Sequence, residues 1–234
     1  QLIEKSKVNR KAYLFVYNYL ARSYCHNGKF VELEEICLEA LQMAEDFIDF
    51  YYYLGVAQSH LKKDQKAIES FENYLRILED YENSITTKHQ TLTKGTLGLS
   101  QEVYLSLCVL YKKIKNKEEA LKYAQKITKD YMLKRKMPHI VELYVDLDRY
   151  EELKNEYDRV LNMDEEIICI FYTSLEKNME KQDIGKKERL IKLFSIGDCN
   201  YSLLNRVRLC IKENAESINQ EVLERIDKLN FKAL

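Results

Sequence analysis

The sequence predicts an all-α fold made of paired helices that repeat along the chain. The 234 residues include one proline and six glycines, the residue types that most often interrupt helices. Apolar residues recur at spacings of three and four, as they do along one face of an α-helix. The pattern returns in the same register from Leu20 to Leu54, because 54 − 20 = 34. These observations favour a helical-repeat protein.

The clearest pair of helices is predicted for residues 51–61 and 67–75, with a polar turn between them. Small and large apolar residues lie on the faces that would meet: Leu54, Gly55, Ala67, Phe71 and Tyr74. The small residues allow the two backbones to approach closely, and the larger ones fill the space around them. We therefore expect a helical hairpin at this position.

An equivalent pair precedes it, with helices expected at 14–25 and 30–43 and a turn at Gly28. In this pair Ala40 corresponds to Tyr74, because 74 − 40 = 34. Residues 1–12 are polar and basic, and we expect them to form a linker or the end of a preceding element.

A third pair is displaced by an insertion. Leu107 follows Leu54 by 53 positions, which is one period of 34 plus 19. The surplus falls in residues 82–99, for which we expect an extended helix end and a projecting loop. Insertions in repeat proteins often lie near the binding face. A tolerated surface insertion fits this segment equally well.

The pattern weakens toward the C-terminus. Pro138 favours a helix start, because a proline in the first turn loses no hydrogen bond. Leu153 follows Ala120 by 33 positions, close to one period. Further segments with helical apolar spacing are expected to form degenerate repeats or a capping bundle: residues 165–179, 186–194, 201–211 and 222–231.

The helix–turn–helix pattern with its period of 34 resembles the tetratricopeptide repeat (TPR). The resemblance covers residues 14–161 and rests on Leu54-Gly55, Ala67 and Phe71 and on their equivalents in the neighbouring units. It implies an all-α, right-handed superhelix of TPR type with a degenerate helical cap. The implied segments are a linker at 1–12, units at 13–46, 47–81, 100–133 and 134–161, an insertion at 82–99 and capping helices at 162–234.

Stacked TPR units place the first helix of each pair on a concave inner face. In the register above, this face is an aromatic, polar and lightly basic wall: Phe15, Asn18, Tyr19, Arg22, His26, Tyr52, Tyr53, Val56, His60, Leu105, Val109 and Lys112. An extended peptide or a partner helix could lie against such a wall. Most other tyrosines are expected to fill the space between helices.

No motif for catalysis or cofactor binding occurs in the sequence. The four histidines are far apart, and none forms a metal-spaced pair with a cysteine or a carboxylate. Asp146-Leu-Asp148 has the D-x-D form that many glycosyltransferases use to hold a metal–nucleotide pair, but it falls in an expected turn. We therefore predict no catalytic, cofactor-binding or metal-binding residue in this chain.

Composition argues against several partners. A net charge of −1 provides no field that would attract nucleic acid or a membrane surface. No run of 18 apolar residues, as a membrane span requires, is present. The six scattered cysteines form no C-x-x-C pair and favour reduced thiols in a cytoplasmic protein, although their even number also fits a disulfide framework.

A second resemblance covers roughly residues 5–161. The segments 49–57 and 67–75, and the long insertion before Glu102, look like the C-terminal TPR region of bacterial inverting glycosyltransferases. The resemblance implies that a nucleotide-sugar-binding domain, with its acidic metal-binding motif, lies upstream of this chain. No catalytic residue is carried over, because none of that domain is present. A chain that starts at Gln1 rather than Met agrees with a fragment of a longer protein.

The leading hypothesis is a non-catalytic TPR scaffold that binds a protein or peptide, or self-associates, as the C-terminal module of such an enzyme. The alternative is a TPR regulator of the quorum-sensing type, which closes on a peptide pheromone. That alternative predicts a groove rich in Asn and Gln, whereas the inner positions here are more aromatic. An autonomous enzyme has no supporting group of residues.

Overall fold

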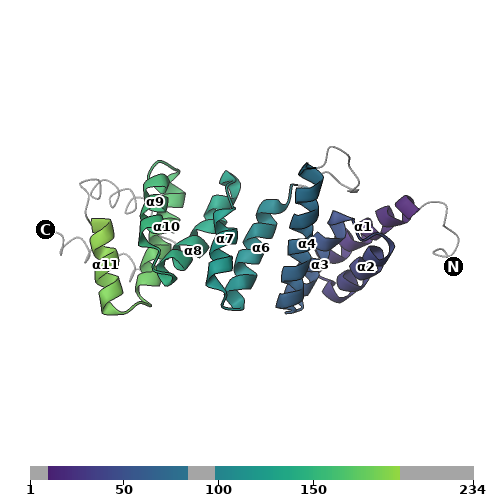
Figure 1. Cartoon of the computed structure of the whole chain (residues 1–234), viewed down its shortest axis with the longest axis horizontal. Helices are drawn as coiled ribbons and strands as arrows, with labels where there is room; N and C mark the ends of the chain where they lie inside the picture. Colours follow the sequence, from purple (N-terminus) through teal and green to yellow (C-terminus); the bar gives the residue numbers. More distant parts are fainter. Residues whose placement is uncertain (1–9, 84–97, 196–234) are drawn as a thin grey trace. The chain divides into compact units, whose positions relative to one another are not determined.

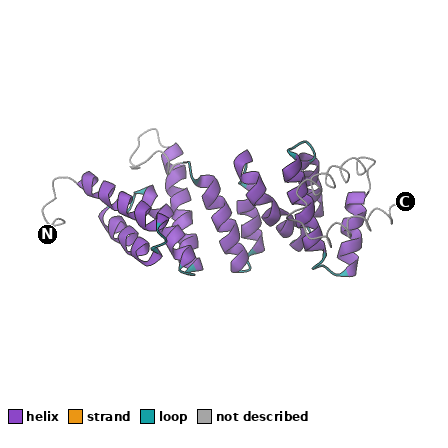
Figure 2. Cartoon of the chain, turned by 180° about the vertical axis from the view of Figure 1, so that it is seen from behind, coloured by secondary structure: helices purple, strands orange, loops and turns teal. Residues whose placement is uncertain are grey.

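The computed structural model describes residues 10–83 and 98–195, and every regular element in these ranges is an α-helix (Figures 1 and 2). The chain divides into two compact units, residues 1–129 and residues 130–234. The predicted all-α fold class is therefore confirmed. No helix in the described ranges combines the length and the apolar character that crossing a bilayer requires.

The first unit contains three antiparallel helical pairs. Their helices are α1 (Arg10–His26) and α2 (Phe30–Met43), α3 (Ile48–His60) and α4 (Asp64–Asn83), and α6 (Ser100–Lys113) and α7 (Lys117–Gln125). In the first two pairs the second helix also packs on the first helix of the next pair, so that α2 contacts α3 and α4 contacts α6. The predicted helix at 30–43 has the observed bounds, and the helices at 14–25, 51–61 and 67–75 are present. The expected extension of the helix before the insertion reaches Asn83, whereas the expected loop lies outside the described residues.

The repeat register is visible in the backbone. One residue in the turn of each pair has a positive φ: Gly28 (68°), Lys62 (60°), Lys115 (63°) and Asp148 (57°). The intervals between them are 34, 53 and 33 positions (62 − 28, 115 − 62 and 148 − 115), as predicted from the apolar pattern. In each turn the next N–H donates to the carbonyl five residues upstream, as from Lys63 to Gln58 at 2.9 Å. This hydrogen bond closes a Schellman motif.

Replacing Lys115 with glycine is expected to raise the free energy of unfolding by about 0.5–1 kcal/mol. A residue with a side chain costs roughly 1–2 kcal/mol in the left-handed conformation, and the greater freedom of glycine in the unfolded chain offsets about 0.5–1 kcal/mol of that gain. Urea denaturation followed by circular dichroism measures the change. The reverse exchange, Gly28→Lys, should lower stability by a similar amount. An unchanged or lower stability of Lys115→Gly would contradict the assigned turn geometry.

The core of the first unit depends on a close approach between α3 and α4. Gly55 and Phe71 are both buried, and a Cβ atom built on Gly55 would lie 2.7 Å from the Phe71 ring. The absence of a side chain at Gly55 therefore makes room for the ring. The equivalent positions in the first pair carry Ala21 and Cys37, which are fully buried in one apolar cluster. The first pair thus has a larger residue on its first helix (Ala21 in place of Gly55) and a smaller residue on its second helix (Cys37 in place of Phe71).

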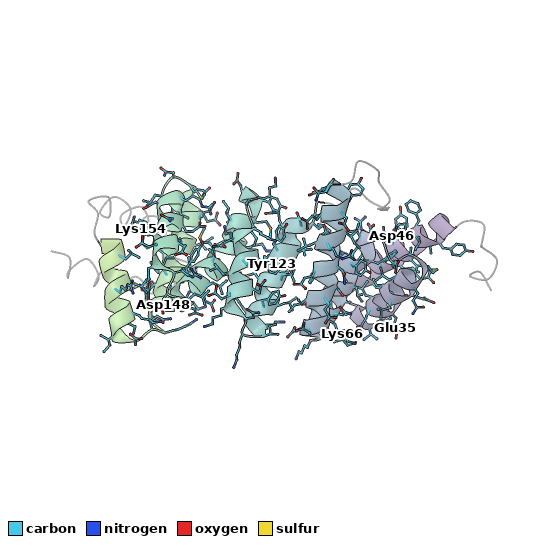
Figure 3. The ribbon with its side chains drawn as sticks, viewed as in Figure 1. Glu35, Asp46, Lys66, Tyr123, Asp148 and Lys154 are labelled. Carbon is cyan, nitrogen blue, oxygen red and sulfur yellow. The ribbon has the colours of Figure 1, made fainter. Side chains whose placement is uncertain are left out.

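Polar contacts also join neighbouring pairs. Glu72 of α4 accepts hydrogen bonds from the hydroxyls of Tyr111 (2.6 Å) and Tyr123 (3.1 Å). The two tyrosine rings stack with their centroids 5.6 Å apart, and Figure 3 labels Tyr123 on α7. Burial raises the pKa of both phenols, and the hydrogen bonds to Glu72 raise it further. The third pair is therefore fixed to the second by a half-buried polar contact as well as by apolar packing.

The second unit contains α8 (Asp130–Asp146), α9 (Tyr150–Val160), α10 (Glu165–Met179) and α11 (Ile184–Ser195), and α10 packs against α8. The predicted helix at 165–179 has the observed bounds, and the one at 186–194 lies within α11. The predicted helices at 201–211 and 222–231 lie outside the described residues.

The prediction that a helix starts near Pro138 is wrong, because Pro138 lies inside α8. A proline in a helix interior removes one backbone hydrogen bond and normally kinks or ends the helix. Here Met137, Ile140 and Val141 around the proline are buried. The packing of this apolar face outweighs the lost hydrogen bond, which a sequence rule based on proline alone does not include.

Candidate functional site

The predicted wall consists of side chains that occupy repeated positions on α1, α3 and α6. Asn18, Tyr52 and Leu105 form one row, since 52 − 18 = 34 and 105 − 52 = 53. A second row, one turn later in each helix, comprises Arg22, Val56 and Val109. All three helices belong to the first unit, so that one compact body carries the whole candidate site.

The predicted wall residues differ in how far solvent reaches them. Phe15 and Tyr19 are 38% and 70% exposed. Asn18 and Leu105 are buried and therefore offer little surface to a ligand. The remaining predicted residues are exposed (Arg22, His26 and His60) or half-buried (Tyr52, Tyr53, Val56, Val109 and Lys112).

Tyr52 lies at the centre of an aromatic cluster. Its ring centroid is 5.4 Å from that of Tyr53, 6.4 Å from that of Phe71 and 6.1 Å from that of Tyr74. These are the separations of favourable edge-to-face and tilted aromatic pairs. These neighbouring rings restrict the rotamers of Tyr52. Its half-buried ring is therefore a pre-positioned apolar surface that would lose little further side-chain entropy on binding a ligand.

Tyr53 belongs to the contact between the first two pairs. It packs against the apolar cluster formed by α1, α2 and α3. Burial raises the pKa of its phenol; the neighbouring Cys25 also raises it, and the Arg22 guanidinium lowers it. The ring is therefore placed beside α1, next to the exposed Arg22.

Two buried oxygen atoms on the wall helices have no hydrogen-bond partner among the described residues. They are Oδ1 of Asn18 on α1 and Oε2 of Glu102 on α6. A buried polar group without a partner costs roughly 1–3 kcal/mol, and more when it is charged. Such groups are rare in folded proteins and call for an explanation.

Glu102 is a wall residue that the sequence prediction missed. It lies three positions before Leu105, on the same side of α6, and 53 positions after Asp49 (102 − 49 = 53). Asp49 is fully buried. Burial raises the pKa of the Tyr74 phenol on α4, and a backbone hydrogen bond at Leu99 lowers it. The nearby Tyr52, Glu102 and Asp49 raise it further. The helical period alone could have found this acidic row.

His60 has a packing role in addition to its place on the wall. Its ring stacks on that of Phe30 with the centroids 3.9 Å apart and the planes nearly parallel, at 3°. His26 is the equivalent residue of the first pair, since 60 − 26 = 34, and it is exposed.

The D-x-D segment is engaged in structural contacts. Asp148 accepts a hydrogen bond from the Tyr150 hydroxyl at 2.7 Å and pairs with Lys186 at 2.7 Å. The hydrogen bond from Lys186 lowers the pKa of Asp148. In the ranges that the structure describes, no group of three or more His, Cys, Asp or Glu residues is arranged to hold a metal ion.

Comparison with solved structures identifies the class of fold. YrrB, a TPR protein with an unusual peptide-binding site, matches 76% of this chain and 84% of its own length with a TM-score of 0.51 and 14% identity. A putative kinesin light chain from Podosopora anserina, with nearly identical TPR-like repeats, matches 91% of this chain and 100% of its own with a TM-score of 0.50 and 14% identity. No protein-family model and no curated protein matches the sequence. The chain therefore has a TPR-type helical-repeat fold.

Proposed function

We propose that the first unit is a protein-interaction module that binds a peptide segment of a partner along α1, α3 and α6. The observation that carries this proposal is the pair of buried acceptors, Asn18 Oδ1 and Glu102 Oε2, which lack partners among the described residues. Both lie on helices of the wall, and rotation of either side chain would bring its oxygen, which solvent does not reach in the free protein, to an N–H donor of a bound peptide. The cost of leaving the acceptors unpaired in the free protein would be recovered in the complex.

The aromatic residues of the wall support the same function. Tyr19 and Phe15 expose their rings on α1, and Tyr52 is held in place by Phe71 and Tyr74. Rigid aromatic side chains provide large contact areas at a low entropic cost. A wall with aromatic surface and a few buried acceptors suits a peptide better than a small charged metabolite.

The test uses peptides selected from a displayed random library for binding to the intact chain, with affinity measured by fluorescence anisotropy. Replacing Asn18 with leucine removes the unpaired oxygen and keeps the branched shape and the number of side-chain heavy atoms. We expect this variant to gain about 1 kcal/mol in unfolding free energy and to bind the selected peptides about tenfold more weakly. A gain in stability together with a loss of binding distinguishes a ligand-contacting residue from a structural one.

Asn178 provides a matched control. It is also buried, but its amide nitrogen donates to the Ser174 carbonyl at 2.8 Å. The Asn178→Leu variant should therefore lose stability and keep its peptide affinity. If Asn18→Leu binds the selected peptides as tightly as the wild type, the wall is not the binding site.

The remaining assignments are further proposals. A role as the C-terminal module of a bacterial glycosyltransferase rests on the sequence resemblance alone, and sugar transfer by this isolated chain would contradict a non-catalytic module. The pheromone-sensing alternative would require backbone-binding Asn and Gln side chains, to which the predicted wall contributes Asn18. No disulfide joins the four described cysteines to one another, which supports the proposed cytoplasmic location.

A further inference from the structure

The helix α1 exposes an apolar surface that its packing in the first unit does not use. Four large apolar side chains with exposed fractions of 38–70% lie close together on it: Phe15, Val16, Tyr19 and Leu20. Its opposite side is buried through Leu14, Tyr17 and Ala21. A helix that is apolar on both sides normally has a packing partner on each.

The repeat register identifies what usually covers this surface. Val16 and Leu20 correspond to Phe50 and Leu54 on α3, since both differences are 34. Phe50 and Leu54 are 0% and 4% exposed and belong to one apolar cluster with residues of α2. Val103 and Leu107, 53 positions further along, are fully buried on α6, which packs on α4. In both later pairs, the second helix of the preceding pair contacts the face that α1 leaves open.

The same two interfaces contain a polar contact made from one repeated position of the first helices, although the glutamates that accept it are 38 positions apart rather than 34 (72 − 34 = 38). Gln58 of α3 donates to Glu34 of α2 at 3.5 Å, and Lys63 pairs with the same carboxylate at 2.5 Å. Tyr111 of α6 donates to Glu72 of α4 at 2.6 Å. In each case a donor near the end of a first helix holds a glutamate from the second helix that precedes it.

The first pair presents the equivalent donors without a glutamate. Tyr24 corresponds to Gln58 and Tyr111 (58 − 34 = 24 and 111 − 53 − 34 = 24), and Lys29 corresponds to Lys63 (63 − 34 = 29). Lys29 is exposed, and no ion pair joins it to any described residue. A carboxylate placed above Val16 and Leu20 would meet both donors. The open face is thus complementary in charge to an acidic helix.

A third repeated contact extends the match. His60 stacks on Phe30, the first residue of α2, and Lys113 pairs at 3.3 Å with Asp64, the first residue of α4. His60 and Lys113 are equivalent, since 113 − 60 = 53, and the corresponding residue of α1 is the exposed His26. A helix on the open face would place its first residue against His26.

We propose that the open face of α1 binds an amphipathic, acidic α-helix of another polypeptide, in the place that α2 takes on α3. The contacts of α2 describe this partner. It has an aromatic or acidic first residue for His26, a glutamate four residues later for Tyr24 and Lys29, and small apolar residues along the side that covers Val16 and Leu20. The centre of this face, Val16 and Leu20, lies outside the predicted wall, whereas Phe15, Tyr19 and His26 border both surfaces.

The probe for this proposal is a hydrocarbon-stapled, fluorescein-labelled peptide with the sequence of residues 30–44, which forms the helix that covers α3 in the intact chain. Its affinity for the full chain is measured by fluorescence anisotropy. We expect saturable binding that Leu20→Asp weakens at least about tenfold, because a charge would be buried in an apolar contact. The control Val31→Asp, on an exposed residue of α2, should leave the affinity unchanged.

A charge reversal tests the polar contact. Lys29→Glu should weaken binding about fivefold, and a peptide that carries lysine in place of the residue equivalent to Glu34 should restore it. The Asn18→Leu variant should bind this probe normally, so that failure of the wall proposal and failure of this one are distinguishable. The proposal is overturned if the probe does not bind, or if Leu20→Asp and Val31→Asp bind it equally well. It is also overturned if sedimentation shows a dimer of the chain that Leu20→Asp dissociates, because a second copy would then occupy the face.

Discussion

Replacing Phe71 with alanine is expected to lower the free energy of unfolding by about 3–5 kcal/mol, the usual cost of emptying a buried aromatic site. The ring is 1% exposed and fills the space that Gly55 leaves between α3 and α4. It also contacts the Tyr52 ring, with the centroids 6.4 Å apart. Removing the Phe71 ring should therefore also displace Tyr52 on the wall, and the peptide affinity should fall together with the stability. Urea denaturation monitored by circular dichroism gives the free energy.

A companion variant tests the close approach itself. Gly55→Ala places a Cβ atom 2.7 Å from the Phe71 ring, and such overpacking costs about 1–3 kcal/mol. Because alanine favours a helix over glycine by about 1 kcal/mol, the net loss should be smaller than that of Phe71→Ala. Combining Gly55→Ala with Phe71→Leu should recover part of the loss. A stabilised Gly55→Ala protein would show that the ring does not lie against Gly55.

Stability is expected to fall steeply as the pH rises above about 10. Burial raises the pKa of several phenols above the unfolded value of 10.0, most strongly for Tyr74, Tyr111, Tyr123 and Tyr172. Above pH 10 the unfolded chain releases these protons while the folded chain retains them. The stabilisation is therefore complete below pH 10 and is lost as the pH rises through the raised folded values. Urea denaturation at pH 8, 9.5 and 10.5 measures the decline.

Variants with one phenol removed provide the control for the pH dependence. Tyr123→Phe should reduce the slope of stability against pH between 10 and 10.5, because it removes one of the responsible groups. The buried Lys136 acts in the opposite sense, since burial lowers its pKa, and its contribution to stability grows as the pH approaches 10.5. A stability that is constant from pH 8 to 10.5 would contradict the assigned burial of the phenols.

The fold could be predicted because its main determinants are local and periodic. The spacing of two helices in contact is visible in Leu54, Gly55, Ala67 and Phe71. Because the same pattern occurs 34 residues earlier, it also predicts the helices of the first pair. The position of Pro138 inside a helix could not be predicted in this way. Its effect depends on the tertiary packing of α8, and no local signal in the sequence reports that packing.

The site could be predicted only at the level of helices. Periodicity indicates that residues 15–26, 52–60 and 105–112 contribute to one wall. It does not distinguish the buried Asn18 from the exposed Tyr19, because burial depends on how far the neighbouring helix covers each residue. The missing partners of Asn18 and Glu102 also depend on three-dimensional contacts. The open face of α1 emerges only when the burial of equivalent residues is compared between pairs.

Photo-crosslinking from the wall tests the central claim most directly. A benzoylphenylalanine residue is introduced at position 22, 56 or 109, on the three wall helices, or at the exposed positions 69 or 76 on α4, and the chain is irradiated with a library-selected peptide. If the wall binds the peptide, mass spectrometry will find crosslinks from positions 22, 56 and 109 and none from 69 or 76. Crosslinks from α4 alone would show that the ligand binds elsewhere and that α1, α3 and α6 do not form the binding surface.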